Sequence, residues 1–252
     1  MITTYHRPST LDEALALLSQ PNTVPLGGGT LLSQPKTAPV SVVDLQRLGL
    51  DSIRINGNPS TGSGQALQIG ATCTLQTLLE AADCPKALQT ALKLEAPINI
   101  RNTATAAGTL VAGDGRSTFV TTLLALDAKI TIVSEQSSVV SIGEYILTHP
   151  QGLITQIAVP LNAKFAFEFV SKTPADKPLI CAALTQWNSG RTRLALGGYG
   201  ASPLLAMDGT EADGLDTAAR NAYHEANDEW ASAEYRMDVA ATLAKRCLAG
   251  LK

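Results

Sequence analysis

Residues 98–115 read INIRNTATAAGTLVAGDG. The segment is nearly free of charge and is filled with small, hydroxyl and amide side chains. Such a segment can pass beside a bulky ligand and offer it backbone and hydroxyl hydrogen bonds, while Arg101 positions the segment or neutralises a phosphate. The same residues also suit a tightly packed buried loop in which Arg101 and Asn102 satisfy backbone groups. From this segment alone, both interpretations stay open.

A glycine-rich stretch lies upstream, where residues 26–32 read LGGGTLL. Successive glycines let backbone N–H groups turn toward one point and approach a ligand closely. Phosphate oxygens suit such a group of donors, and Thr30 adds a hydroxyl. The stretch matches neither G-x-G-x-x-G nor a P-loop. By composition alone it also fits an ordinary glycine-rich turn.

A third stretch places Lys172 and Asp176 just after an alternating aromatic run, Phe165, Phe167 and Phe169. Alternation of this kind is typical of a strand with one buried face. Local evidence favours a solvated strand end for the two charged residues, so this stretch alone predicts no site.

Composition excludes several classes of function. The chain has 252 residues, 45% of them hydrophobic and 16% charged, and a net charge of -3. This charge argues against nucleic acid or an anionic membrane as the main partner. No apolar run approaches the roughly 18 residues that a membrane span needs, and the first residues lack the apolar centre of a signal peptide. We therefore expect a cytoplasmic protein without a membrane span.

The metal-binding residue types are dispersed. The four cysteines form no C-x-x-C pair, and the three histidines show no zinc-like spacing. An iron–sulfur cluster commonly draws several ligands from one tight loop, which this sequence lacks. Any redox chemistry would therefore depend on an organic cofactor.

Periodicity and turn signals predict mixed helices and strands. Helices are expected after caps at Ser9, Thr74, Ser117 and Ser232, and also at about residues 86–94 and 215–227. Strands are expected at residues 24–26, 40–45, 67–69, 129–133, 165–169, 179–187 and 193–199, with a loop or hairpin at residues 56–65. The class is α+β, and the domain boundary is expected near residues 160–164.

Five motifs in order resemble one family, the FAD-binding subunits of the molybdenum hydroxylases. Residues 26–32 resemble the family's A-G-G-T-D-L-L loop, and residues 69–75 (IGATCTL) resemble I-G-A-x-T-T-L. Residues 100–109 partly match I-R-N-x-G-T-I-G-G-N. Residues 123–128 (LLALDA) and 232–236 (SAEYR) match two further family motifs. This order and spacing cover nearly the whole chain and are similar to those of carbon monoxide dehydrogenase medium subunits and the xanthine dehydrogenase flavin domain.

The resemblance implies a two-part FAD-binding domain at residues 1–162, with subdomains at about 1–55 and 56–162. A small C-terminal domain with a three-stranded antiparallel sheet and helices would follow at residues 163–252. It implies that the first loop holds the FAD pyrophosphate and that later segments lie along the cofactor. The FAD-binding residues implied are Leu26, Gly27, Gly28, Gly29, Thr30, Leu31, Leu32, Arg101, Asn102, Thr105, Gly108, Thr109, Ser117, Thr118 and Lys172.

Several positions depart from the family pattern. Ala104 and Ala107 stand where the family usually has glycines, and Thr109 stands in place of an Asn. Thr118 replaces an expected Asp, and Phe169 occupies a place often held by Lys. Asp114 precedes a glycine instead of the usual proline. An added Cβ at residue 107 can obstruct a ligand that approaches the backbone.

The function implied is that of an electron-transfer oxidoreductase subunit, inactive alone. It would pass electrons from a partner's iron–sulfur clusters through FAD to an external acceptor. The partners implied are a molybdopterin-binding large subunit and a 2Fe-2S small subunit, and no catalytic side chain or metal site is expected in this chain. The departures motivate an alternative, a flavin-free structural subunit that kept the fold and lost FAD. A third hypothesis is a stand-alone flavin oxidoreductase with its own small substrate.

Overall fold

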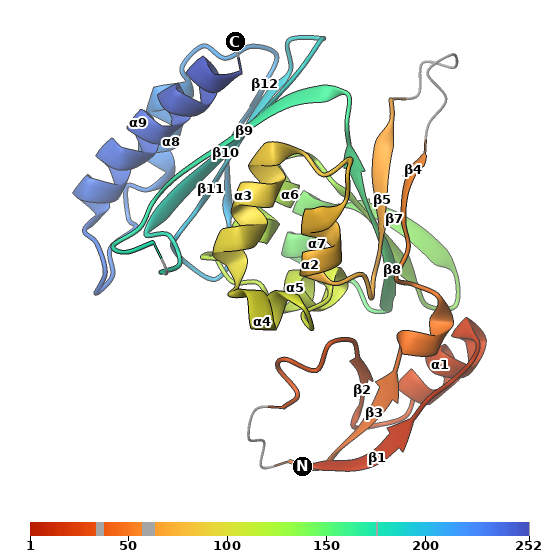
Figure 1. The fold of residues 1–252 in the computed structure, drawn as a ribbon. Helices are drawn as coiled ribbons and strands as arrows, with labels where there is room; N and C mark the ends of the chain where they lie inside the picture. The colour runs from red at the N-terminus through yellow and green to blue at the C-terminus, as the bar shows by residue number, and fades with distance from the viewer. Residues whose placement is uncertain (34–37, 57–63, 175, 252) are drawn as a thin grey trace.

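The computed structural model describes residues 1–33, 38–56, 64–174 and 176–251. Within these ranges the strands form sheets of three, five and four strands, which follow one another along the chain. Figure 1 shows the three-stranded sheet apart from the larger body, which holds the other two sheets with helices between and beside them. The expected α+β class is confirmed.

The N-terminal unit is a small parallel sheet with one helix. Strands β1 (Ile2–His6) and β2 (Thr23–Leu26) both pair in parallel with the central β3 (Val40–Asp44). Helix α1 (Leu11–Leu18) packs Ala14 and neighbouring leucines against this sheet and against Leu153. The predicted cap was one residue early, because Thr10 accepts from the backbone N–H of Glu13 while the Glu13 carboxylate accepts from Ser9. This arrangement is close to a capping box, except that Glu13 accepts from the residue before the cap.

The chain then crosses to the five-stranded sheet through the 3-10 turn η1 (Gln46–Leu48). The strand order is β4-β5-β8-β6-β7, and all neighbours are antiparallel. The strands are β4 (Ile53–Asn56), β5 (Ala66–Gly70), β6 (Lys129–Val133), β7 (Ser137–Ser141) and β8 (Leu153–Pro160). The loop predicted at residues 56–65 lies mostly outside the described residues.

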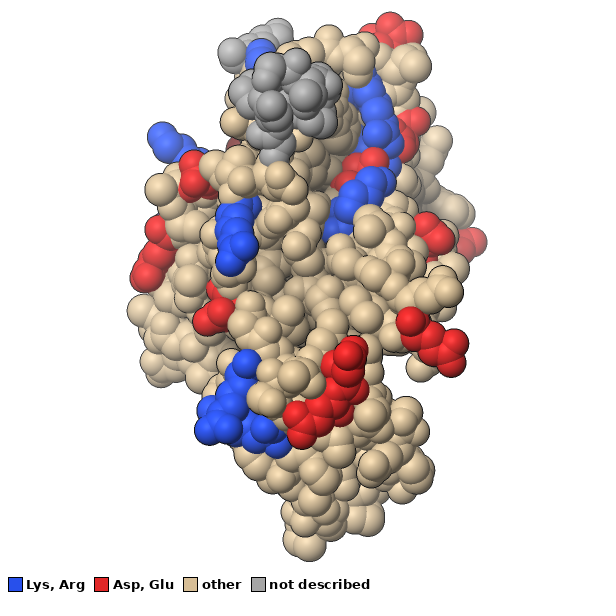
Figure 2. Space-filling view, turned by 90° about the vertical axis from the view of Figure 1, so that its right-hand side faces the viewer, with Lys and Arg blue, Asp and Glu red and all other residues tan. Residues whose placement is uncertain are grey.

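Helices cover one face of this sheet and leave the other to solvent (Figure 1). Successive side chains of a strand point to opposite faces of the sheet. Leu67, Ile69 and Ile157 point to the covered face, where each is fully buried. The covering helices are α2 (Leu75–Glu80), α3 (Lys86–Glu95), α4 (Ile98–Arg101), α5 (Ala106–Ala112), α6 (Thr118–Ala125) and α7 (Ile142–Thr148). On the face seen in Figure 2, basic and acidic side chains are interspersed and form no broad area of one charge.

The C-terminal unit has one strand more than predicted. Its sheet runs β12-β11-β10-β9 and is antiparallel throughout, with four strands among the described residues where the sequence predicted three. The strands are β9 (Ala163–Val170), β10 (Ile180–Trp187), β11 (Thr192–Gly197) and β12 (Leu204–Gly209). Edge strand β12 is mostly exposed, so it lacks the alternation by which a half-buried strand is recognised.

Two helices close the chain against this sheet. Helix α8 (Leu215–Ala222) is shorter than expected, whereas α9 (Ala233–Gly250) begins after the predicted Ser232 cap. Arg236 explains the local SAEYR motif, because its fully buried side chain donates to the carbonyls of Leu179 and Gly198 and to both carboxylate oxygens of Asp228. The motif therefore fastens α9 to the sheet.

Candidate functional site

A cavity of about 410 Å³ lies between the glycine-rich loop, the five-stranded sheet and α5. Its volume falls in the range of small-molecule sites, roughly 300 to 1,000 Å³. The loop contributes most of one wall, and α5 contributes another. The lining residues are Val24, Pro25, Gly27, Gly28, Gly29, Thr30, Leu31, Leu32, Leu45, Ala71, Thr72, Thr105, Ala107, Gly108, Val111, Tyr145, Gly152, Leu153 and Ile154.

The glycine-rich loop leaves the carboxyl end of β2 and packs directly on the segment before α5. A Cβ at Gly28 would lie 1.6 Å from the carbonyl oxygen of Thr103, and one at Gly27 would lie 2.6 Å from the Thr105 hydroxyl. Gly29 has a φ of +71°, a conformation that side chains disfavour. The structure thus brings together the glycine-rich loop and the segment at residues 98–115. Gly27 and Gly28 are needed because the two segments pack too closely to admit a side chain at either position.

The loop also presents free hydrogen-bond donors. Within the described part of the chain, the backbone N–H groups of Gly28, Gly29 and Thr30 find no acceptor, and neither does the Thr30 hydroxyl. The loop carbonyl of Gly29 is used, since it accepts from Ser33. Consecutive free donors at a cavity wall suit an anionic ligand group.

Helix α5 forms the opposite wall. Thr105 caps the helix by accepting from the backbone N–H of Gly108 at 3.2 Å, so its hydroxyl is already engaged. Ala107 lines the cavity, and its N–H donates to the carbonyl of Ala71. A Cβ at Gly108 would meet the Thr105 hydroxyl at 2.8 Å. The methyl group of Ala107 is therefore one departure from the family pattern that reaches the cavity.

These residues fit the expected FAD. The donor set of the loop, backbone N–H groups and one hydroxyl, matches the chemistry of a pyrophosphate, because such donors neutralise its oxygens without a metal. The rest of the cavity is walled by apolar side chains such as Leu31, Leu45 and Ile154. Apolar walls suit the faces of aromatic rings.

Some lining residues were missed. Ala71 and Thr72 lie within the IGATCTL motif, which had served only to identify the family. Tyr145 and Leu153 reach the cavity from α7 and β8, at places that no local pattern marks. Their position depends on contacts between distant segments, so no sequence signal could have found them.

Arg101 is not among the described residues that line the cavity. Its Nε donates to Gln76 at 2.9 Å, and its Nη1 donates to the carbonyls of Ala96 and Lys93. Arg101 thus satisfies carbonyls at the end of α3, which is the structural role that the sequence had left open. Asn102 is exposed at the end of α4.

Ser117 and Thr118 lie in a buried hydrogen-bond network, which we call the Glu95 network: Glu95, Ser117, Thr118 and the N–H of Phe119. Ser117, Thr118 and Phe119 all donate to Oε2 of Glu95, at 2.9, 3.2 and 2.9 Å. Lys177 approaches the other oxygen at 3.5 Å. Ser117 also caps α6, as predicted. The network is closed, with no side chain directed into the cavity lining.

Lys172 lies elsewhere again. Its Nζ is 4.8 Å from the centre of the Trp230 ring, and the guanidinium of Arg116 is 5.0 Å from the same ring. This cation–π arrangement lies outside the cavity lining, as do Leu26, Arg101, Asn102, Thr109, Ser117 and Thr118. Contact of these residues with FAD stays a prediction.

The cysteines and the other metal-binding residue types lie apart from one another in the described residues. They contain no group of three or more His, Cys, Asp and Glu placed to hold a metal ion. Burial raises the pKa of Cys73 to about 11 and that of Cys84 to about 12. These thiols stay protonated at neutral pH, as expected of inert core residues. Among the described residues, no helix has the length and apolar character that a membrane crossing requires.

Similarity to known proteins supports one family. The family described as the FAD binding domain in molybdopterin dehydrogenase matches residues 1–162 of this chain. An uncharacterized protein, YgfM, of Escherichia coli (strain K12) is 28% identical and aligns with 96% of this chain and 94% of its own length.

Solved structures agree in fold. The Cu,Mo-CO dehydrogenase in its cyanide-inactivated form matches with a TM-score of 0.82 and 25% identity, over 99% of this chain and 97% of that one. Quinoline 2-oxidoreductase from Pseudomonas putida 86 matches with a TM-score of 0.80 and 21% identity, over 98% of this chain and 96% of that one. The second likeness, at this identity, concerns the fold alone. By its family match over residues 1–162, the chain belongs to the FAD-binding domains of the molybdopterin dehydrogenases.

Proposed function

We propose that this chain is the electron-transfer subunit of a molybdenum-containing hydroxylase and holds FAD in the cavity between the glycine-rich loop and α5. The observation that carries the proposal is the row of free backbone donors at Gly28, Gly29 and Thr30 on the wall of this cavity. Family membership supplies the identity of the cofactor. When bound, FAD supplies the capacity to accept and release electrons.

The chain's own residues would bind and orient the cofactor. The N–H groups of Gly28, Gly29 and Thr30 would donate to the pyrophosphate, with Gly27 allowing the loop to approach Thr105. Leu31 and Leu32 would cover an apolar part of the cofactor, together with Val111 from α5. Gly108 would let the cofactor pass near the first turn of α5.

The cavity offers no general acid or base for substrate chemistry. Among the described residues its lining includes no Asp, Glu, His, Lys or Arg. Tyr145 is the ionisable group present there, and burial raises its pKa above the ordinary value of 10.0. Its hydroxyl therefore stays protonated at neutral pH. This lining supports a carrier of electrons over a stand-alone oxidoreductase with its own substrate.

Partners complete the proposed activity. The resemblance implies a molybdopterin-binding large subunit and a 2Fe-2S small subunit. The name of the structurally similar Cu,Mo-CO dehydrogenase includes molybdenum, the metal expected on the large subunit. On this proposal the isolated chain is inactive, because substrate oxidation takes place on another subunit. Electrons would pass from the partner's clusters through FAD to an external acceptor.

The experiment that tests the proposal is purification of the chain with its partner subunits, followed by flavin analysis and acceptor assays. We expect about one FAD per chain and reduction of an artificial electron acceptor by the assembled complex but not by the isolated chain. An active complex without flavin would overturn the proposal. It would support the alternative, a structural subunit that kept the fold and lost FAD. The methyl group of Ala107, which lies in the cavity wall, is the structural observation that suggests this alternative.

A further inference from the structure

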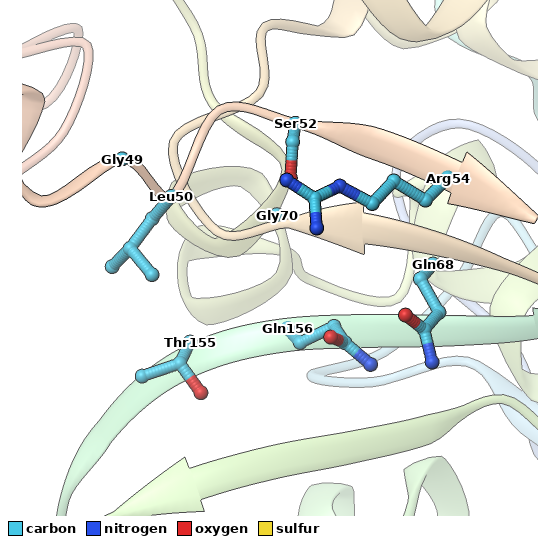
Figure 3. Close-up of a pocket in the computed structure, with 8 residues that line it drawn as sticks. All are labelled: Gly49, Leu50, Ser52, Arg54, Gln68, Gly70, Thr155 and Gln156. Carbon is cyan, nitrogen blue, oxygen red and sulfur yellow. The ribbon is translucent and has the colours of Figure 1, made fainter. Parts of the chain in front are cut away.

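A second pocket, of about 220 Å³, lies on the face of the five-stranded sheet that the helices leave open. Figure 3 shows its lining: the crossing segment from Gly49 to Ser52 on one side, and side chains from β4, β5 and β8 on the other. The lining residues are Gly49, Leu50, Ser52, Arg54, Gln68, Gly70, Thr155 and Gln156. Among the described residues, this pocket shares no lining residue with the cavity proposed for FAD.

Strand alternation places its polar side chains on one face. Arg54 on β4 stands opposite Gln68 on β5, and Gly70 stands opposite Gln156 on β8. Residues two apart on a strand point the same way, so Gln68 and Gly70 share this face. Figure 3 shows the Arg54 side chain running back along β4 toward Ser52 and Gly70.

Gly70 lets the crossing segment pack directly on β5. A Cβ at this position would lie 2.1 Å from the carbonyl oxygen of Leu50, so no side chain fits there. The crossing segment is held over it by hydrogen bonds from Gly70 to the carbonyl of Ser52 and from Thr72 to the carbonyl of Leu50, both at 2.9 Å. The floor of the pocket is therefore fixed by the backbone.

Thr155 donates its hydroxyl to the carbonyl of Thr131, but the other polar side chains of the pocket have no partner among the described residues. Within the described part of the chain, the side chains of Ser52, Arg54, Gln68 and Gln156 make no hydrogen bond or ion pair. No Asp or Glu of that part lines the pocket. Elsewhere the chain pairs its arginines readily, as at Arg191 and Arg193, which both bind Asp208. A guanidinium left without a carboxylate beside two free amides can receive an anion.

We propose that this pocket binds a small oxyanion, a carboxylate or a phosphate group, through the guanidinium of Arg54. The fork of N–H donors on Arg54 matches two oxygens of such a group. Gln68, Gln156 and the Ser52 hydroxyl supply donors and acceptors for the remainder of the ligand. The site is separate from the proposed FAD function and does not rest on it.

The test is isothermal titration of the purified full chain, without added FAD, with inorganic phosphate and, separately, with succinate. Sodium chloride at the same ionic strength serves as the reference for screening. We expect saturable binding at one site per chain for at least one of the two anions, and the preferred anion identifies the ligand class. Arg54→Gln should weaken that binding by about tenfold or more, which corresponds to the loss of a charge-assisted contact.

Two further variants separate a built site from a general charge effect. Arg54→Lys keeps the charge but lacks the fork, so we expect an affinity between those of wild type and Arg54→Gln. Arg47→Gln removes the same charge from an exposed position outside the pocket, and we expect wild-type affinity. The proposal is overturned if neither anion binds saturably, or if Arg54→Gln and Arg47→Gln behave alike. A parallel FAD titration reports separately on the first cavity.

Discussion

The glycine-rich loop and the start of α6 carry similar sequence signals but have opposite structures. Both are built from small and hydroxyl residues, and the family resemblance places both near FAD. In the loop, consecutive N–H groups at Gly28, Gly29 and Thr30 face no protein acceptor in the described residues. At α6, the donors of Ser117, Thr118 and Phe119 converge on the carboxylate of Glu95, which is almost fully buried.

The difference teaches that composition alone does not separate a ligand site from a buried structural network. An open set of donors is stable only where water or a ligand can satisfy it. A closed set satisfies its own donors and stabilises the fold without a ligand. Variants of the loop should therefore change FAD binding, and variants of the Glu95 network should change the free energy of unfolding.

The largest effect is expected for Glu95→Ala. The substitution leaves several buried donors without an acceptor, so we expect the free energy of unfolding to fall by about 3 to 5 kcal/mol. Chemical denaturation measures it. The matched control is Glu80→Ala, at an exposed carboxylate bonded to Gln76, which should change stability by less than about 1 kcal/mol.

The same variant also tests the comparison. Folded Glu95→Ala should bind FAD within about threefold of the wild-type affinity, a difference below 1 kcal/mol. If Glu95→Ala instead stayed stable and lost FAD, the Glu95 network would belong to the site and the contrast with the loop would be wrong.

Gly28→Ala should show the next largest effect. Its Cβ collides with the backbone of Thr103, so the loop must move away from α5. We expect a loss of about 2 to 3 kcal/mol in stability and a fall in FAD affinity of about tenfold or more, measured by denaturation and by flavin fluorescence. Gly143→Ala is the control, because its Cβ would meet only Leu124 at 3.9 Å. Wild-type FAD affinity in Gly28→Ala would show that FAD does not use this loop.

A smaller effect, at acid pH, concerns another closed network. Burial opposes ionisation of Asp228, but hydrogen bonds from Arg236, Ala231 and Trp230 outweigh it and hold its pKa below the ordinary 3.8. The resulting stabilisation is present above pH 3.8 and is lost as the pH falls through the lower pKa of the folded state. Unfolding free energies measured across this window should fall more steeply for wild type than for Asp228→Asn. Equal slopes would show that Asp228 does not carry the effect.

The smallest effect is expected for Ala107→Gly. Removal of the methyl group opens the cavity beside α5, so FAD affinity should rise by about threefold, or somewhat under 1 kcal/mol. Glycine in the helix should lower stability by about 0.5 to 1 kcal/mol. Ala112→Gly, at the exposed end of α5 and outside the lining, should show the stability loss without the gain in affinity. A gain in both variants would exclude the methyl group as the cause.

Much of the fold could be predicted because its signals are local. Side-chain chemistry and periodicity predict the caps at Thr74, Ser117 and Ser232 and a helix at about residues 86–94, which the structure has as Lys86–Glu95. Strand β1 was missed because its ITTYH sequence is short and largely exposed. Helix α5 was missed because its small residues show little periodicity, although Thr105 caps it.

The candidate site could be predicted only in part. The glycine-rich loop and the region around residues 105–108 were identified, and both line the cavity. The roles of Arg101 and Lys172 could not be read from their neighbours. Arg101 donates to the carbonyls of Lys93 and Ala96, and Lys172 lies over the ring of Trp230, both through contacts between separate segments. The sequence alone does not show whether an arginine or lysine side chain binds a phosphate, a carbonyl group or an aromatic ring.

The most direct test of the central claim is titration of the purified chain with FAD, followed by visible absorption and flavin fluorescence. The account predicts saturable binding at about one FAD per chain, with the absorption bands of a protein-bound flavin. A folded, colourless chain that never binds FAD would contradict the account. The cavity between the glycine-rich loop and α5 would then be a remnant of the family fold. Ala107 would be the first residue to replace with the glycine that is usual in the family.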